Sequence, residues 1–359
     1  SEAYLGYVGF ASGAATWAFT LYGGAIADRV PRRNLIVVTQ TLSMLLAFVL
    51  ALLTFLRLVA PWHIVMLAFL LGVVNAFDAP ARQSFVLEMV EKPVLTNAIA
   101  LNSTMFNTAT AVGPAVGGLA YAYLGPAWCF TINGLSFLAV IAALLAMRLP
   151  PWKQPVRRRS TFGEIREGLH AVRADRRIAA IIFLMGSVSL FGMSFATLIP
   201  AWAVQILHGD SRINGFLQSA RGIGAVSAAL WIASYAHRRM KGRTITVASF
   251  LFPMMLILFS FTRTLPLSLL AIFGVGAANI VTNNLANALV QTLTPDAVRG
   301  RVMSIYMLSF FGFMPIGALL AGQLATVAGV PVTIVVGAGG TLLCALAVAL
   351  FVPSVRRLD

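Results

Sequence analysis

The chain has 359 residues, of which 59% are hydrophobic and 10% are charged, and its mean hydropathy is +0.87. This composition excludes an ordinary soluble domain, in which about a quarter of the residues are charged. The net charge of +15 would suit a nucleic-acid-binding protein. The basic residues lie in the loops between apolar segments, however, and that position favours a membrane surface instead.

Apolar runs of roughly 20 to 30 residues recur along the chain, each long enough to cross the hydrocarbon core of a bilayer as a helix. They lack the alternation of apolar and polar residues that marks the strands of a membrane barrel. We therefore predict an all-α polytopic membrane protein. The predicted spans cover residues 3–27, 34–57, 61–82, 96–124, 126–148, 178–207, 212–236, 244–263, 265–291, 300–326 and 330–352.

The loops between these spans alternate in charge. The loops on one side of the membrane, together with the C-terminal tail, hold 22 of the 26 Lys and Arg residues. Basic loops mark the cytoplasmic side, so the C-terminus is predicted to be cytoplasmic. The basic residues would contact anionic lipid headgroups there, and no nucleic-acid partner is needed to explain them.

The first basic loop carries a recognisable pattern, Gly24-x-x-x-Asp28-Arg29-x-x-Arg32-Arg33. It resembles the loop between helices 2 and 3 of the major facilitator superfamily, with Pro31 where that family has Gly. Residues 75–85, 97–103 and 112–118 resemble the enterobactin-exporter group of the superfamily, which includes macrolide and multidrug efflux proteins. The resemblance covers essentially the whole chain and implies two pseudo-symmetric bundles of six helices.

The resemblance also implies a gating network of charges at the cytoplasmic side. Arg32 or Arg33 would pair with Asp78, and Asp28 would pair with Arg299 or Arg301. The alternatives are that the loop only sets topology, and that Asp78 forms a local helix pair with Arg82, four residues on. The predicted network comprises Asp28, Arg29, Arg32, Arg33, Asp78, Arg82, Arg299 and Arg301.

Residues 113–118 resemble the antiporter signature of the superfamily's exporters. A proline inside a helix removes a backbone donor and bends the helix, and glycines let a neighbouring helix approach closely. A bend of this kind could limit leakage of the coupling ion; the alternative is a packing kink without directional meaning. The predicted kink consists of Gly113, Pro114, Gly117 and Gly118.

Residues 149–177 separate the two halves. They begin with prolines and a run of arginines, and continue with apolar residues at helical spacing between charges. This pattern predicts a cytoplasmic linker with an amphipathic helix on the membrane surface. The predicted domains are an N-terminal bundle over residues 1–148, the linker, and a C-terminal bundle over residues 178–359.

An internal repeat relates the two halves. The block that starts at residue 72 recurs about 201 residues later, which places Asp78 on Asn279 and Pro114 on Pro315. Under this pairing the span at 178–207 has no partner in the first half. We therefore expect that the chain holds eleven of twelve helices and lacks the first one.

Arg221 is the sharpest single candidate for substrate binding, because an ionisable residue near the middle of a span is expensive unless it serves a function. Its guanidinium could bind an anionic or catecholic group, although a structural ion pair or a snorkelling side chain is the alternative. Amides could face a wet cavity or join helices, and aromatic residues could line the cavity or pack. The predicted substrate site comprises Arg221, Gln218, Asn102, Asn107, Asn283, Asn287, Trp202 and Phe310.

The sequence contains no metal-ligand spacing, nucleotide-binding loop or clustered histidines, so it predicts neither an enzyme nor a metal or cofactor. Without a nucleotide-binding motif the energy source is expected to be an ion gradient. The resemblance implies a monomeric, proton-coupled exporter of a siderophore or drug-like molecule in the bacterial inner membrane, with substrate, protons and membrane lipids as partners. The alternative is a lipid or lysolipid flippase on the same fold.

Overall fold

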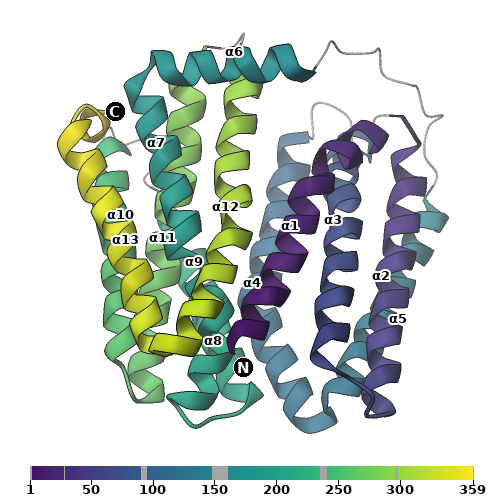
Figure 1. Ribbon diagram of the computed structural model, residues 1–359. Helices are drawn as coiled ribbons and strands as arrows, with labels where there is room; N and C mark the ends of the chain where they lie inside the picture. The colour runs from purple at the N-terminus through teal and green to yellow at the C-terminus, as the bar shows by residue number, and fades with distance from the viewer. Residues whose placement is uncertain are drawn as a thin grey trace. The chain divides into compact units, whose positions relative to one another are not determined.

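The structure is a computed structural model that describes residues 2–27, 29–89, 95–147, 161–234, 241–295 and 298–358. Within these ranges it contains helices and connecting turns but no strand (Figure 1). The elements are α1 (Glu2–Ala27), α2 (Arg32–Phe55), α3 (Pro61–Met89), α4 (Leu95–Leu124), α5 (Pro126–Ala146), α6 (Thr161–Ala174), α7 (Arg176–Ser187), η2 (Val188–Gly192), α8 (Phe195–Gln205), α9 (Ser211–Ser234), α10 (Lys241–Phe261), α11 (Leu265–Leu293), α12 (Arg299–Ala328), α13 (Val330–Phe351) and η3 (Val355–Arg357).

All eleven predicted spans coincide with helical segments to within a few residues, except that α3 runs on to Met89. Among the described residues, eight helical stretches are long and apolar enough to cross a membrane; α1, α4 and α9 do not meet that criterion. The predicted all-α polytopic membrane fold is therefore confirmed.

The chain divides into two compact units. The first unit comprises residues 7–109 and 119–158, and the second comprises residues 1–6, 110–118 and 159–359. In the first unit, α2 packs against both α3 and α5. Its buried apolar cluster consists of Ala27, Ile36, Ala81, Phe85 and Leu144.

The second unit has two buried clusters. Trp202, Phe252 and Phe259 are fully enclosed in one of them, and Met185 and Tyr306 lie in the other. Tight packing of such large side chains supplies most of the cohesion of a bundle in lipid, where the hydrophobic effect between helices is weak. The packed helices hold the polar residues of the candidate site, described below, in fixed positions.

The predicted span at 178–207 is a continuous helical segment, but it is not a single α-helix. It is formed by α7, a π-helical segment at Val188–Gly192 and α8. The wider turn is visible in the bond from the Met193 N–H to the Val188 carbonyl, which spans five residues at 2.7 Å. Such segments often occur at functional sites.

A helix, α6, is present where the sequence predicts the amphipathic helix of the linker, and it lies across the ends of α7 and α12 (Figure 1). Val172 is buried, and Gly168 sits against the side chain of Arg301 on α12. Glu167 forms an ion pair with Arg301 at 2.6 Å. The helix is therefore docked on the second unit through both apolar and charged contacts.

The two halves do repeat, but the predicted offset of 201 residues is wrong. Helix α3 begins at residue 61 and α11 at residue 265, α4 at 95 and α12 at 299, and α5 at 126 and α13 at 330, so each pair is 204 residues apart. Gly125 and Gly329, which precede α5 and α13, share a φ of 81°. For α1 with α9 and α2 with α10 the offset between helix starts is 209 residues.

The correction changes which residues are equivalent. At 204 residues Asp78 corresponds to Thr282 rather than to Asn279, and Pro114 corresponds to Ala318 rather than to Pro315. A slip of three residues is close to one helical turn, so apolar faces still match in the wrong register. That is why the sequence pattern alone did not reveal the error.

Candidate functional site

Asp78 is the only charged residue in the described part of the chain that falls in the buried class, with 9% of its surface exposed. Its Oδ1 accepts hydrogen bonds from the Thr39 hydroxyl at 2.6 Å and from the Gln40 amide at 3.0 Å. Its Oδ2 accepts from the guanidinium of Arg82, which is half exposed. The buried carboxylate is thus paired and hydrogen-bonded, as a buried charge must be.

Two neighbouring helices position this carboxylate. Thr39 and Gln40 lie on the buried face of α2 together with Ile36 and Ser43, while Asp78 and its partner Arg82 lie on α3. Sequence reasoning missed the two partners on α2. The available signal was a pair of polar residues inside an otherwise apolar span, because such residues usually have a partner on a neighbouring helix.

A third helix closes on α3 just before Asp78. A Cβ atom placed on Gly23 of α1 would lie 2.1 Å from the carbonyl oxygen of Ala76, whereas one on Gly24 would meet nothing within 4 Å. Only glycine at position 23 allows the two backbones to approach this closely. The residue that brings α1 against α3 is therefore Gly23, although the sequence pattern singled out Gly24.

The remaining residues of the predicted gating network have other partners. The guanidinium of Arg33 donates to the carbonyls of Leu145 (2.8 Å) and Met147 (3.3 Å) at the end of α5, so Arg33 does not pair with Asp78 in this structure. Cations commonly bind the free carbonyls at a helix C-terminus, which explains this preference. The local Asp78–Arg82 pair is present instead.

On the second unit, Arg301 binds Glu167, and Arg299 donates to the carbonyls of Gln291 (3.0 Å) and Thr294 (3.3 Å). Asp28, their predicted partner, lies outside the described residues. Arg29 and Arg32 lie in and after the short turn between α1 and α2.

Arg221 lies near the middle of α9, where α9 crosses α11. A Cβ atom on Gly276 of α11 would be 2.0 Å from the Arg221 carbonyl oxygen, so the two backbones are in contact there. The guanidinium carbon is 6.0 Å from the centre of the Phe195 ring, which is the outer range of a cation–π contact. No described carboxylate pairs with Arg221.

The other predicted substrate residues differ in their settings. Gln218, one turn before Arg221, has a buried amide oxygen that accepts no hydrogen bond from the described residues. The Asn283 carbonyl accepts from the Tyr306 hydroxyl at 3.3 Å, and the Asn287 side chain accepts from Gln291. Phe310 makes an edge contact with Phe311.

Trp202 is fully buried and lies 4.5 Å from the Phe259 ring, so in this structure it is a core residue rather than part of a cavity wall. The side chains of Asn102, Asn107 and Pro114 lie outside what the structure describes. Helix α4 runs without a break through the predicted kink, from Gly113 to Gly118.

The corrected repeat shows that the charged groups belong to one half only. The first-unit cluster of Thr39, Gln40, Asp78 and Arg82 is matched in the second unit by uncharged residues. Arg221 in turn is matched by an uncharged residue of α1. The pairs are Thr39 with Ala248, Gln40 with Ser249, Asp78 with Thr282, Arg82 with Ala286, and Arg221 with Ser12.

Comparison with known proteins identifies the family to which this chain belongs. A family profile described as "Transmembrane secretion effector" matches residues 1–359. The chain belongs to the major facilitator superfamily. It is therefore a transporter rather than an enzyme, as predicted.

Three relatives of this superfamily member are similar along most of its length. A staphyloferrin A transporter of Staphylococcus aureus is 24% identical over 91% of this chain and 82% of its own. The multidrug efflux pump Tap of Mycolicibacterium fortuitum is 27% identical over 95% and 85%. The enterobactin exporter EntS of Shigella boydii is 26% identical over 87% and 74%, which agrees with the predicted subgroup.

A solved structure of the peptide transporter POT has the same fold, with a TM-score of 0.78 over 100% of this chain and 88% of its own, at 15% identity. The protein is an integral membrane transporter of the superfamily, and its relatives export small molecules.

Proposed function

We propose that this protein is a proton-coupled exporter of an amphiphilic small molecule, of the siderophore or drug-like class, that works by alternating access as a monomer in the bacterial inner membrane. Its relatives carry substrates of both kinds, as their names state. The observation that carries the proposal is the buried carboxylate of Asp78, present in one repeat and absent from the other.

Asp78 is proposed to exchange protons with the cytoplasmic side. While it is ionised, it holds Thr39 and Gln40 of α2 and Arg82 of its own helix. Protonation removes the charge that attracts Arg82 and weakens the bonds that tie α2 to α3. A local electrostatic change of this kind can bias an element with two arrangements, and intramembrane carboxylates commonly serve proton transfer.

A gating role for basic residues of both units belongs to the same proposal. Arg29, Arg32 and Arg33 follow α1, and Arg299 and Arg301 begin α12. In the other orientation of the transporter these residues and Asp28 would exchange their present partners. Such an exchange between ion pairs is a common way for a transporter to switch between two states.

Substrate recognition is assigned to the second unit, around Arg221. The guanidinium has an aromatic ring beside it and no carboxylate partner among the described residues. Gln218 offers a free amide oxygen one turn away. A cation, an aromatic face and a hydrogen-bond acceptor suit an anionic or hydroxyl-bearing aromatic group on the substrate.

The test uses the full-length protein in everted vesicles with an acidified lumen. A catecholate siderophore, a macrolide and a dye are added in turn, and the lumenal pH is followed. We expect the pH to rise with one of the three. Asp78→Asn should abolish the rise while substrate binding remains, and Thr282→Val, the matched change in the other repeat, should leave both unchanged.

Arg221→Ala should reduce substrate binding at least tenfold without changing thermal stability. A normal pH response in Asp78→Asn would remove Asp78 from the coupling mechanism. No pH response to any compound, together with rapid movement of labelled lipid between leaflets, would replace export by lipid flipping.

A further inference from the structure

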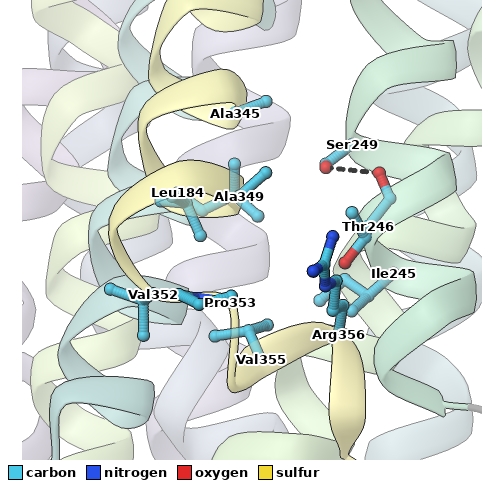
Figure 2. Close-up of a pocket in the computed structure, with 11 residues that line it drawn as sticks. Leu184, Ile245, Thr246, Ser249, Ala345, Ala349, Val352, Pro353, Val355 and Arg356 are labelled. Carbon is cyan, nitrogen blue, oxygen red and sulfur yellow. Dashed lines mark hydrogen bonds between the residues drawn. The ribbon is translucent and has the colours of Figure 1, made fainter.

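A groove opens on the second unit between α10, α13 and the C-terminal turn η3 (Figure 2). It is open rather than enclosed: the empty space in and around it is roughly 290 Å³, and the cavity volume inside it is about 10 Å³, room for about one water molecule. Its walls are mostly small and apolar, and the guanidinium of Arg356 points into it beside Thr246 (Figure 2). The lining residues are Leu184, Ile245, Thr246, Ser249, Ala345, Val348, Ala349, Val352, Pro353, Val355 and Arg356.

The chain after α13 folds back to form one edge of this groove. The N–H of Gly242, in the first turn of α10, donates to the carbonyl of Leu358 at 2.8 Å. A Cβ atom on Gly242 would lie 2.2 Å from the Val355 carbonyl oxygen, so the turn rests directly on α10. Arg356 is thereby held above the groove by backbone contacts on both sides of it.

The charges at this end are almost all positive. Lys241 and Arg243 begin α10, and Arg356 and Arg357 lie on the turn. Arg356 has no carboxylate partner among the described residues. The groove therefore combines an available guanidinium at its mouth with an apolar interior, which is the chemistry of an anionic amphiphile.

Three of the residues that line the groove have larger or more apolar equivalents in the first half. The equivalents of Ala345 and Ala349 in α5 are Ile141 and Leu145, 204 residues earlier. The equivalent of Thr246 in α2 is Val37, 209 residues earlier. The first half thus carries larger or more apolar side chains at the same places, so the fold itself does not require the space.

We propose that this groove binds one anionic phospholipid, with its phosphate on Arg356 and the upper part of one acyl chain along the open, apolar side of the groove at α13. The volume is too small for a whole lipid, so the rest of the molecule would lie in the surrounding bilayer. The hydroxyls of Thr246 and Ser249 already donate to the carbonyls of Gly242 and Thr246. Their oxygens can still accept, which suits the hydroxyl-bearing headgroup of phosphatidylglycerol.

The occupant is a membrane lipid rather than a soluble anion because the groove is apolar below its mouth. Charge-assisted hydrogen bonds from a guanidinium to a phosphate are strong and can be bidentate. Basic residues at the membrane surface attract anionic lipids, and basic pockets between helices bind their headgroups. The site is independent of the proposed proton coupling and of the transported substrate.

The test is lipid binding by the full-length protein purified in detergent, measured by native mass spectrometry during titration with phosphatidylglycerol. One molecule should be retained in preference to phosphatidylcholine. Arg356→Gln should weaken this binding roughly tenfold, whereas Arg357→Gln, the same loss of charge at the next residue, should change it less than about threefold.

Ala349→Leu tests the apolar part of the groove without changing its charge. It introduces the residue type that the first half has at the equivalent position, Leu145. It should weaken binding roughly tenfold, while Leu350→Phe, on the exposed face beside it, should not. Equal losses in Arg356→Gln and Arg357→Gln would overturn the proposal, as would unchanged binding in Ala349→Leu. Binding of sn-glycerol 3-phosphate as tight as that of the lipid would reduce the site to a simple anion site.

Discussion

Replacing Gly23 by Ala should destabilise the first unit, although alanine is the better helix former. The new methyl group would lie 2.1 Å from the Ala76 carbonyl oxygen and 3.0 Å from the Phe77 Cα, and real Cβ contacts essentially never fall below 3.0 Å. These are backbone atoms, so α1 and α3 must separate. Overpacking of this kind costs about 1–3 kcal/mol, against a helix-propensity gain of about 1 kcal/mol. Because the overlap is with backbone atoms that cannot rotate away, the cost falls in the upper part of this range, and we expect a net loss of about 1–2 kcal/mol.

Gly24→Ala is the matched control, because the adjacent methyl group would meet nothing within 4 Å. It should stabilise the protein by about 0.5–1 kcal/mol through backbone entropy alone. The assay is the fraction of monodisperse protein that survives heating in detergent. The two midpoints should differ by roughly 5 °C or more, with Gly23→Ala the lower. Equal midpoints, or a lower midpoint for Gly24→Ala, would refute the close crossing of α1 and α3.

Three further changes test the second unit. Gly276→Ala places a methyl group 2.0 Å from a backbone oxygen of α9 and should cost at least as much as Gly23→Ala in the same heating assay. A double-mutant cycle of Glu167→Gln and Arg301→Gln should give a coupling of less than about 1 kcal/mol, because both side chains are substantially exposed; a larger value would show a desolvated pair. Asp175→Ala removes the side chain that caps α7 and should cost about 1 kcal/mol at pH 7, whereas Asp175→Asn should keep most of the cap. The side-chain hydrogen bond from Arg177 lowers the pKa of Asp175, so the charge-dependent part of its contribution is present above the unfolded pKa and is lost as the pH falls below about 4, where wild type and Asp175→Asn should converge in thermal stability.

The sequence predicts the helices well because length and hydropathy are local properties. The eleven spans and the amphipathic linker helix needed no knowledge of packing. Contacts between helices are not local, and there the predictions were weaker. Arg33 binds the free carbonyls at the end of α5 in this structure, and nothing in the loop pattern encodes where α5 ends in space.

The π-helical segment at Val188–Gly192 was not predictable for a related reason. A backbone bond that spans five residues instead of four leaves no mark on hydropathy, and the apolar run continues through it. The predicted offset of the repeat differs from the observed offset by less than one helical turn. An amphipathic or apolar helix has a similar sequence pattern after such a slip, so the pattern did not reveal the difference. Equivalent helix starts and the matching turns at Gly125 and Gly329 were needed to fix it.

The corrected register separates what the fold needs from what transport needs. Asp78 in one repeat and Thr282 in the other occupy equivalent positions between packed helices. The Thr282 hydroxyl donates a hydrogen bond to the Ala278 carbonyl of its own helix, so it needs no partner on another helix. The second half therefore builds the same architecture without a carboxylate. A buried ion carries a desolvation cost of several kcal/mol that a threonine avoids.

The same comparison applies to Arg221, a cation that the second unit has and the first unit lacks at the equivalent position. Arg221 and Ser12 occupy equivalent places, and each lies with its carbonyl oxygen about 2 Å from where a methyl group on the crossing glycine, Gly276 or Gly72, would stand. The backbone geometry is shared, so the crossing itself does not require a guanidinium. The first half thus has a buried carboxylate that its repeat lacks, and the second half has a cation in the middle of a helix that its repeat lacks. Packing does not explain either group. This supports the proposal that Asp78 transfers protons and that Arg221 binds the substrate.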